Sequence, residues 1–393
     1  MTGGSDPGAS GAISSRAVQG RSAEGAQPRV ELISDRQQAA AWRSDWNRLA
    51  DAMPKLGPFG RWEWFDCAWP WAALDGRPVV LRVHDGERTL GLIALLHTAT
   101  GPRRLRLRGW TFLAVPDTQF NGIIAPPESM AAVADAFARW LRRCPWRWWR
   151  LDLERIPAEG GEAELLAAAL RRHGMPVREE HAGDNFGIFP DGAWEGYYGG
   201  LSRRLKKGNN LVANRLKRAG DVELRWLTGE QVDEHAAAAL AELSARSWKS
   251  ATTATSLDQP GPREFYAALV EHGRRDGWLS VWQLWLDDKL LATELQIYFG
   301  NVVYALRSDF EPDAADLSPG TYANWQVIRS LYDLPVRAYY FGPGENAYKK
   351  RWTQSGAPLR RITAYPSHPL GQALGSMETR VLPWLRSRLP RRG

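Results

Sequence analysis

Apolar and polar residues alternate with a period of two in two distant stretches of the chain. Residues 78–98 read PVVLRVHDGERTLGLIALLHT, with an Asp-Gly pair between two apolar runs, and residues 278–300 read WLSVWQLWLDDKLLATELQIYFG, with an Asp-Asp pair in the middle. A period of two sends alternate side chains of a strand to opposite faces, and turn-forming residues between two such runs are typical of a β-hairpin. The pattern therefore predicts one hairpin in each stretch.

A helix and then a further strand are predicted after each hairpin. Residues 128–142 and 319–332 have the apolar spacing of amphipathic helices, and they lead into the aromatic-rich strands 146–153 and 336–341. The same order recurs after roughly 190–200 residues, a period far longer than that of a solenoid, so we predict a duplicated domain. Each copy is expected to be a mixed α/β (α+β) domain with a mostly antiparallel, twisted sheet flanked by helices.

The predicted elements divide the chain into four segments. Residues 1–28 are rich in Gly, Ser and Ala and are expected to form a disordered tail. The first copy covers residues 29–185, the second copy covers residues 186–368, and a basic helix is expected at 369–393. A chain of 393 residues is longer than one ordinary core needs, which agrees with two domains.

Composition places the chain among soluble globular proteins. Hydrophobic residues make up 44% and charged residues 24%, and no apolar run is long enough to cross a membrane. The two cysteines, Cys67 and Cys144, have no metal-ligand spacing and exclude a disulfide framework, and the seven histidines are scattered. We therefore expect a cytoplasmic protein without a metal site. Walker A and G-x-S-x-G motifs are absent, so kinases and hydrolases receive no support.

Positive charge is concentrated in one predicted helix. The chain carries a net charge of +7, which favours anionic partners, although an Arg-rich composition alone gives the same sign. The helix at 201–220 has no acidic residue, and its basic residues are Arg203, Arg204, Lys206, Lys207, Arg215, Lys217 and Arg218. Like charges three and four positions apart cost helix stability unless an anion offsets them. We predict that Arg204 and Lys207 contact an anionic glycan, nucleotide sugar or phosphate; a membrane surface and a solvated helix face are the alternatives.

Two carboxylates on neighbouring predicted strands are candidates for a general base. Glu294 lies in the middle of the second hairpin, on the same face as Gln296. Asp309 follows on the next strand, two residues after Arg307 and on the same face as that arginine. Acyl transfer to an amine requires a base, and a desolvated carboxylate can have the raised pKa that a base needs. The alternatives are an exposed Glu294 and an Arg307–Asp309 pair that neutralises itself.

An anion site is predicted where the helix 319–332 begins. Ser318 is a candidate N-cap, Pro319 occupies the first helical position, and Gly320 leaves the backbone N–H groups around Thr321 unobstructed. Helix N-termini bind phosphates through free N–H groups and the helix dipole. An ordinary helix start without a ligand is the alternative.

Two further segments carry candidate ligand contacts. In FGPGENAYKKRW (341–352), Gly344 lets the backbone approach a ligand closely, and Tyr348 is expected to pack with Trp352 on one helix face. Lys349 and Lys350 are expected to point away from that face, toward a phosphate or an acceptor. Trp248 and Lys249 open a Ser/Thr-rich stretch, 250–262, whose length predicts a mobile lid or an acceptor-binding loop.

These features, taken in order, resemble one known family. The matching stretches are the basic helix and its continuation (201–224), SARSWKS (244–250), REFYAALVEHGRRDGWLSVWQL (263–284), LLATELQIY (290–298), SDFEPDAADLSPGTYANWQVI (308–328) and FGPGENAYKKRW. Together they resemble the CelD-like acetyltransferases of the GNAT superfamily, which are associated with cellulose and exopolysaccharide biosynthesis. The resemblance covers roughly residues 190–365, and it reaches 29–185 only through the predicted repeat. The chain is more distantly similar to the Fem-type tandem-GNAT aminoacyl transferases, whose long coiled-coil arm is not evident here.

The resemblance implies tandem GNAT-like domains in which the second copy is catalytic and the first shapes the acceptor cleft. The implied donor is acetyl-CoA or another acyl-CoA, and the implied acceptor is an amine or hydroxyl of a sugar or polysaccharide precursor that attacks the thioester directly. The resemblance implies that the catalytic residues are Glu294, Asp309 and Lys349. The residues that it implies bind acyl-CoA are Ser318, Gly320, Thr321, Gly344, Tyr348 and Lys350. The residues that it implies bind the acceptor are Arg204, Lys207, Trp248, Lys249 and Arg307. The usual pyrophosphate motif, Arg/Gln-x-x-Gly-x-Gly/Ala, is replaced by LSPGTYAN at 317–324.

Two other functions stay open at this point. A Fem-type enzyme would transfer an aminoacyl group from tRNA to a cell-wall precursor, and RNA binding through residues 201–218 would favour it. A non-catalytic scaffold would bind an anionic glycan or a membrane through the same helix. No nucleic-acid-binding motif accompanies the basic run, so nucleic acid is an expected partner only under the first of these. The sequence does not indicate an oligomeric state.

Overall fold

The computed structural model describes residues 27–86, 88–100, 107–247, 256–344 and 347–378. The predicted N-terminal tail lies almost entirely outside these residues. Of the predicted C-terminal helix, the described part forms α11 (Pro369–Ser376).

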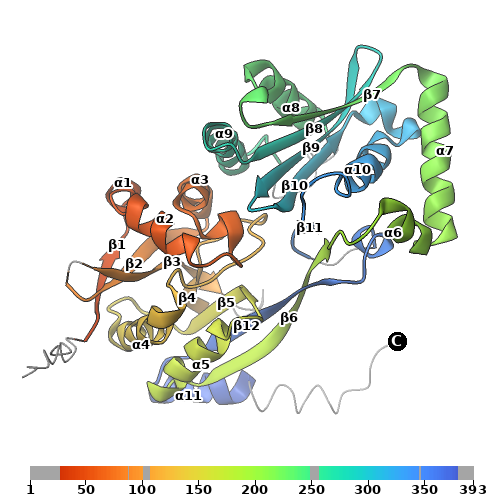
Figure 1. Cartoon of the computed structure of the whole chain (residues 1–393). Helices are drawn as coiled ribbons and strands as arrows, with labels where there is room; N and C mark the ends of the chain where they lie inside the picture. Colours follow the sequence, from red (N-terminus) through yellow and green to blue (C-terminus); the bar gives the residue numbers. More distant parts are fainter. Residues whose placement is uncertain (1–26, 87, 101–106, 248–255, 345–346, 379–393) are drawn as a thin grey trace, which may run out of the picture.

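The described residues form one sheet of twelve strands that runs from the first copy into the second (Figure 1). Its order is β1-β2-β3-β4-β5-β12-β6-β11-β10-β9-β8-β7, and every neighbouring pair is antiparallel except β4/β5 and β10/β11. The strands are β1 (Arg29–Ile33), β2 (Gly76–His84), β3 (Thr89–Thr100), β4 (Leu107–Phe112), β5 (Arg150–Pro157), β6 (Val177–Ile188), β7 (Val222–Thr228), β8 (Leu279–Leu286), β9 (Lys289–Phe299), β10 (Val302–Phe310), β11 (Ala338–Tyr340) and β12 (Gly356–Ala364). The predicted mixed α/β class with a mostly antiparallel sheet is confirmed.

Both predicted hairpins and the repeated order of elements are present. The pairs β2/β3 and β8/β9 form the hairpins, and each is followed by a strand, a helix and a parallel strand: β4-α4-β5 in the first copy and β10-α10-β11 in the second. The first of the two later strands was predicted at 146–153, but β5 begins only at Arg150. The apolar, Trp-rich residues before it, including the buried Trp148, pack outside the strand.

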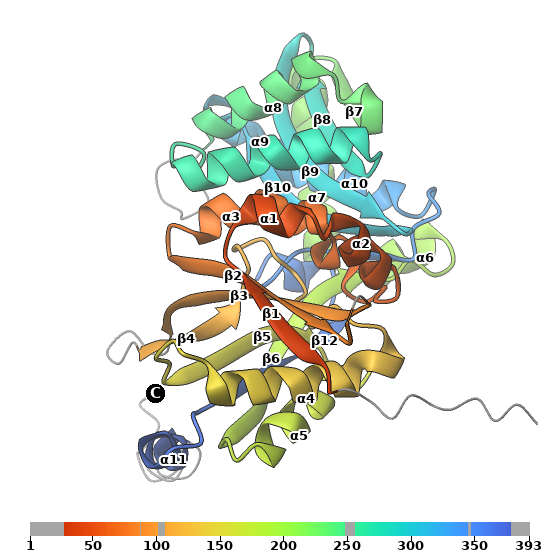
Figure 2. The ribbon, with the colours of Figure 1, turned by 90° about the vertical axis from the view of Figure 1, so that its left-hand side faces the viewer.

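Helices cover both faces of the sheet (Figures 1 and 2). In the second copy, α8 and α9 cover the face that is turned toward α3 of the first copy, and α10 covers the opposite face, with α7 packed on its outside. The helices are α1 (Arg36–Ala40), α2 (Arg43–Asp51), α3 (Trp62–Ala72), α4 (Pro127–Arg143), α5 (Glu162–Arg172), α6 (Trp194–Gly200), α7 (Arg203–Ala219), α8 (Glu234–Arg246), α9 (Pro260–Arg275), α10 (Pro319–Ser330) and α11.

The two copies exchange strands at their junction. β12 comes from the end of the second copy but pairs with β5 of the first copy and with β6. β6 in turn extends far enough to pair with β11. The predicted boundary between residues 185 and 186 therefore falls inside β6, a strand that hydrogen-bonds to both copies. The division of the chain into domains stays a prediction. The shared strands tie the copies into one sheet.

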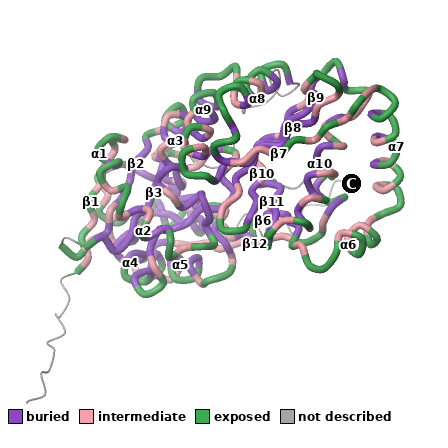
Figure 3. Tube along the Cα trace, turned by 45° about the horizontal axis from the view of Figure 1, so that its top comes forward, coloured by how far each residue is buried: buried purple, intermediate pink, exposed green. Residues whose placement is uncertain are grey.

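The core continues across this junction. The aromatic rings of Phe59 and Trp64 from the first copy contact those of Tyr304 and Phe265 from the second, with centroid distances of 5.2 Å for both inter-copy pairs. Figure 3 shows this buried interior following the sheet, whereas the outer face of α7 is exposed. These contacts pack α3 and the residues just before it against the second copy.

Candidate functional site

Asp309 and Arg307 form a buried pair on the face of β10 that α8 and α9 cover. Arg307 is 5% and Asp309 1% exposed, and the Nε of Arg307 donates to Oδ2 of Asp309 at 2.5 Å. The hydroxyl of Ser244 in α8 donates to the same oxygen at 2.5 Å. A β-bulge between Ala305 and Arg307 shifts the register so that Arg307 lies opposite Leu295 and Asp309 opposite Thr293. The predicted Arg307–Asp309 ion pair is therefore present. It leaves the second carboxylate oxygen of Asp309 as an unused hydrogen-bond acceptor among the described residues.

That acceptor is Oδ1 of Asp309, which has no hydrogen-bond partner among the described residues. An unsatisfied buried acceptor costs roughly 1–3 kcal/mol, so a site that keeps one is able to gain by binding a donor from a ligand. Tyr266 of α9 completes the cluster, because the guanidinium of Arg307 lies 5.5 Å from the centre of its ring. Its hydroxyl donates to Asp117, in the loop after β4. Burial raises the pKa of Tyr266 well above its ordinary value, and the Asp117 carboxylate adds to the shift.

A cavity of about 350 Å³ opens onto this cluster between α8 and α9. Its lining includes Ser244, Tyr266 and Arg307 of this cluster and the apolar residues Leu240, Val270 and Leu295. Charged residues of both signs also line it: Glu234, Arg263, Glu271 and Arg274. The volume and the mixture of an apolar wall with a few convergent polar groups are typical of small-molecule sites.

Glu294 lies on the opposite face of the same sheet. It is 3% exposed, so the alternative of a solvent-exposed carboxylate does not hold. Gln296 donates to it at 3.5 Å, and its negative charge adds to the rise that burial causes in the pKa values of Tyr339 and Tyr348. Because Glu294 faces α10 and Asp309 faces α8 and α9, the two candidate bases do not serve one site.

The helix α10 begins at Pro319, as predicted, with Ser318 in the N-cap position. Ser318 occupies the predicted N-cap position with a left-handed backbone conformation (φ 55°), and its side chain accepts no hydrogen bond from a helix N–H group. Its carbonyl accepts instead from Thr321 and Tyr322, at 3.1 and 3.3 Å. The first turn contains no acidic residue, and a Cβ on Gly320 would meet only the Phe310 ring at 3.5 Å.

The basic helix α7 packs beside this helix start. Its buried side chains Val212 and Leu216 lie in one apolar cluster with Ala323 of α10. Arg215 donates to the carbonyl of Asp316, two residues before Ser318. The other predicted contacts, Arg204 and Lys207, are exposed on the outer face of α7. The arrangement brings a cation to the N-terminus of α10 but leaves most of the basic face in solvent.

Lys349 is directed into the protein, which corrects the prediction that it points toward a ligand. It is 5% exposed, and its Nζ donates to the carbonyls of Gly342, Pro343 and Gly344 at 2.7, 2.9 and 2.8 Å. Burial lowers its pKa to about 8, and the nearby Arg155 adds to the effect. Left-handed backbone at the two glycines, with φ of 88° and 83°, turns these carbonyls toward the lysine. The ammonium is thus engaged by the turn itself.

The remaining predicted residues of this segment lie apart. Lys350 is exposed, and Trp352 is buried at 3%. Tyr348 is 40% exposed, and burial of its hydroxyl group together with the charge of Glu294 raises its pKa well above the ordinary value. The predicted helix face with Tyr348 and Trp352 does not form, because only a short 3-10 turn, Lys349–Arg351, follows the tyrosine. Trp248 and Lys249 lie outside the described residues.

Replacing Lys349 by methionine is expected to destabilise the fold by about 1–3 kcal/mol, because the turn carbonyls lose their charged donor. Urea unfolding measures this difference, and Lys350→Met, at an exposed neighbour, is the matched control that should stay within about 0.5 kcal/mol of the wild type. Unchanged stability of Lys349→Met together with a loss of acyl-CoA affinity would return Lys349 to the ligand-binding role that the sequence suggests.

The strands β10 and β11 separate at the end of the sheet where α10 begins. Their parallel ladder covers only Val302–Tyr304 with Ala338–Tyr340, whereas β10 continues beside β9 to Phe310. Gln119 of the first copy lies where the two strands begin to separate. Its side chain donates to the carbonyl of Ala305 at 2.9 Å and accepts from Asn185 at 3.0 Å. Gln119, Asp117, Ser244 and Tyr266 had no predicted role. Their partners are far apart in sequence, and no local pattern marks them.

Comparisons with known proteins agree with this architecture. Residues 203–350 match the sequence model of the acetyltransferase (GNAT) domain. A search of curated proteins finds no match. The chain is similar in structure to the C-terminal domain (DUF2156) of a proposed lysylphosphatidylglycerol synthetase from Agrobacterium fabrum, with 13% identity, 86% of this chain and 96% of that chain covered, and a TM-score of 0.51. L-PGS from Bacillus licheniformis matches with 11% identity, 87% and 98% coverage and a TM-score of 0.50.

FemX is a further structural match, with 13% identity, 78% and 93% coverage and a TM-score of 0.47. At these identities the likeness concerns the fold. The mixed α/β fold and the repeated order of elements are confirmed, and the match of residues 203–350 to the GNAT domain supports an acyltransferase. Among the described residues, no group of histidine, cysteine and carboxylate side chains is placed to hold a metal, and no helix is long and apolar enough to span a membrane.

Proposed function

We propose that the second copy binds an acyl-CoA and transfers its acyl group to an amine or hydroxyl of an acceptor. The observation that carries the proposal is the divergence of β10 and β11 directly below the start of α10. A gap between two parallel strands offers backbone groups to an extended ligand, and a helix N-terminus above it favours the ligand's phosphates. The match of residues 203–350 to the GNAT domain supports the same assignment.

The donor is proposed to place its phosphates near Gly320 and Thr321, with Arg215 as the neighbouring cation. The corresponding place in the first copy differs in charge and shape. There α4 begins with Pro127 after Pro126 in the N-cap position, and Glu128 lies in the first turn. A carboxylate at that position already interacts with the helix dipole and repels a phosphate. The contrast supports donor binding in the second copy.

The acceptor is proposed to enter through the cavity between α8 and α9. Its nitrogen or oxygen attacks the thioester carbon, a C–N or C–O bond forms, and the C–S bond breaks. Oδ1 of Asp309 takes the proton from the acceptor, the CoA thiolate leaves and is then protonated, and a backbone N–H of β10 stabilises the oxyanion of the intermediate. Asp309 is preferred to Glu294 because only Asp309 lies on the face with the cavity. Because the chain resembles the CelD-like family, we propose that the acceptor is a sugar or polysaccharide precursor.

The proposal predicts that acyl-CoA stabilises the protein. A ligand at 100 times its dissociation constant adds about 2.7 kcal/mol to the free energy of unfolding, which raises the melting temperature measurably. The measurement compares CoA, acetyl-CoA, longer acyl-CoAs and bulk tRNA with the full chain. No shift with any CoA species would refute the proposal. Stabilisation by tRNA alone would favour aminoacyl transfer, for which the exposed basic face of α7 is the supporting observation.

A further inference from the structure

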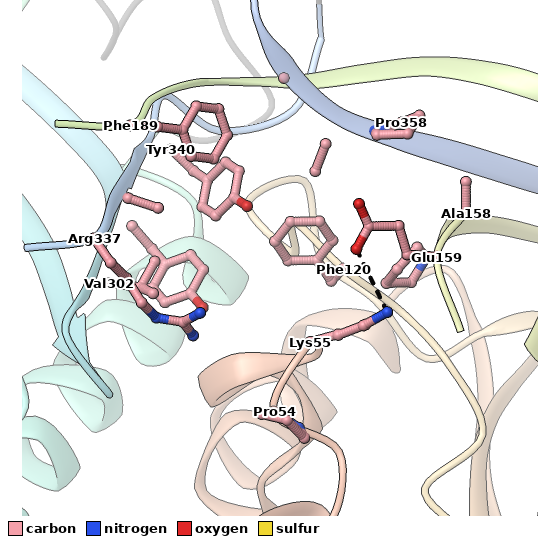
Figure 4. A pocket seen from close by; sticks show the side chains of 15 residues that line it. Pro54, Lys55, Phe120, Ala158, Glu159, Phe189, Val302, Arg337, Tyr340 and Pro358 are labelled. Atoms are coloured by element: carbon pink, nitrogen blue, oxygen red, sulfur yellow. Dashed lines mark ion pairs between the residues drawn. The ribbon is translucent and has the colours of Figure 1, made fainter. Parts of the chain in front are cut away.

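A second cavity, of about 450 Å³, lies between the two copies and shares no lining residue with the cavity between α8 and α9. It is lined by Val302 and Tyr304 at the start of β10 and by Tyr340 at the end of β11, together with Phe120 of the first copy and the first residues of β12. Figure 4 shows its side chains. Tyr304 and Asp309 are five positions apart on β10, which is about 15 Å along a strand. The cavity is therefore separate from the acceptor cavity between α8 and α9.

Aromatic rings form one wall of this cavity. Tyr340 stacks on Tyr304 with a centroid distance of 5.7 Å, and Phe120 and Phe189 meet it edge to face at 5.3 and 5.9 Å. Phe189 is 44% exposed, which is unusual for so large an apolar side chain. The hydroxyl of Tyr340 points into the cavity in Figure 4, and it makes no hydrogen bond within the described part of the chain. The wall thus offers apolar surface together with an open donor and acceptor.

The rim carries two cations on opposite sides. Lys55 is paired with Glu159 at 3.5 Å, and Arg337 lies across the aromatic wall from them (Figure 4). Arg337 is exposed, and its Nε donates only to the carbonyl of Gly300, at 3.3 Å. No carboxylate of the described residues forms an ion pair with it. An arginine without a counter-charge beside an apolar wall suits the bidentate binding of a carboxylate or phosphate.

We propose that this cavity binds a pyranose that carries an anionic group. The sugar's apolar C–H face packs on the aromatic wall, a ring hydroxyl pairs with the hydroxyl of Tyr340, and the carboxylate or phosphate binds Arg337. A nucleotide fits less well, because Tyr304 already covers one face of Tyr340 and both phenylalanine rings lie nearly perpendicular to the Tyr340 ring, so these rings offer no pair of parallel faces to enclose a base. The inference does not rest on the proposed acyl transfer.

Calorimetric titration of the full chain, without acyl-CoA, tests the proposal. The probes are a galacturonate trisaccharide, glucose 1-phosphate, the neutral maltotriose and AMP. We expect binding of one or both anionic sugars and at least tenfold weaker binding of maltotriose. Binding of the trisaccharide alone identifies a uronate site, and binding of glucose 1-phosphate alone identifies a sugar-phosphate site.

Three variants assign the binding to this cavity. Arg337→Gln should weaken the anionic sugar about tenfold or more, and Tyr340→Phe, which removes only the hydroxyl, about three- to tenfold. Arg29→Gln, at an exposed arginine on β1, should leave the affinity unchanged. No anionic sugar binding at millimolar concentration, tighter binding of AMP, or equal affinity of the Arg337→Gln variant would each overturn the proposal. Stabilisation by acetyl-CoA, measured in the same variants, reports separately on the active site.

Discussion

An Asp309→Asn variant is expected to transfer acyl groups about 10²–10⁴ times more slowly than the wild type, the range for removing a general base. In the structure Oδ2 of Asp309 is held by Ser244 and Arg307, whereas Oδ1 is buried without a partner among the described residues. Oδ1 is therefore the atom available to take the acceptor's proton. Asparagine keeps the shape of the side chain and an oxygen for Ser244, but it does not take up a proton.

The measurement is the initial rate of thiol release from acetyl-CoA with a panel of amino sugars. Glu294→Gln is the matched control, because Glu294 is equally buried in the neighbouring strand but lies on the α10 face. It should retain a rate within a few-fold of the wild type. Removing the charge of Asp309 breaks its buried ion pair with Arg307, at a cost of about 3–5 kcal/mol. Rates are therefore compared below the melting temperature of each variant and with CoA affinity determined in parallel. A loss confined to Glu294→Gln would move the base to the other face of the sheet.

Gly320→Glu is expected to weaken acyl-CoA binding at least tenfold, or about 1.4 kcal/mol, while leaving the fold intact. Gly320 occupies the second position of α10, as Glu128 does in α4. A carboxylate there lies in the first turn, where it interacts favourably with the helix dipole and repels the phosphates proposed to bind. The backbone has room for a side chain, since a Cβ meets only the Phe310 ring at an ordinary contact distance of 3.5 Å.

Gly320→Ala is the control for this substitution, and calorimetric titration with CoA gives both affinities. The alanine variant should bind CoA as the wild type does and be somewhat more stable, because alanine favours the helix over glycine by about 1 kcal/mol at an interior position and by less near a terminus. Equal CoA affinity of the glutamate and alanine variants would place the phosphates elsewhere.

Local sequence patterns predicted the helices and strands of this protein well. They did not predict which strands pair when those strands are far apart in the sequence. Periodicity gave the hairpin β8/β9, the helix α7 and the first residue of α10, because each depends on residues close in sequence. The insertion of β12 between β5 and β6 had no signal, since an alternating strand fits any antiparallel neighbour. The repeated order of elements was visible, but the exchange of strands between the copies was not.

The sequence also predicted only those features of the site that depend on residues close together in the chain. Arg307 and Asp309 were expected on one face, and they are. Their position relative to Glu294 depends on the bulge in β10 and on which helices cover each face, and neither follows from the spacing of these residues. The capture of Lys349 depends on the left-handed backbone of the turn before it. The partners Ser244 and Asp117 come from elements that meet only in the folded chain.

Acyl-CoA is proposed to bind in the second copy, between the start of α10 and the diverging ends of β10 and β11. A crystal of the full chain soaked with acetyl-CoA gives the decisive test. We expect the pyrophosphate beside Gly320 and Arg215, with the thioester in the gap that follows Tyr304 and Tyr340. Acetyl-CoA bound instead at the start of α4, between β4 and β5 of the first copy, would contradict it.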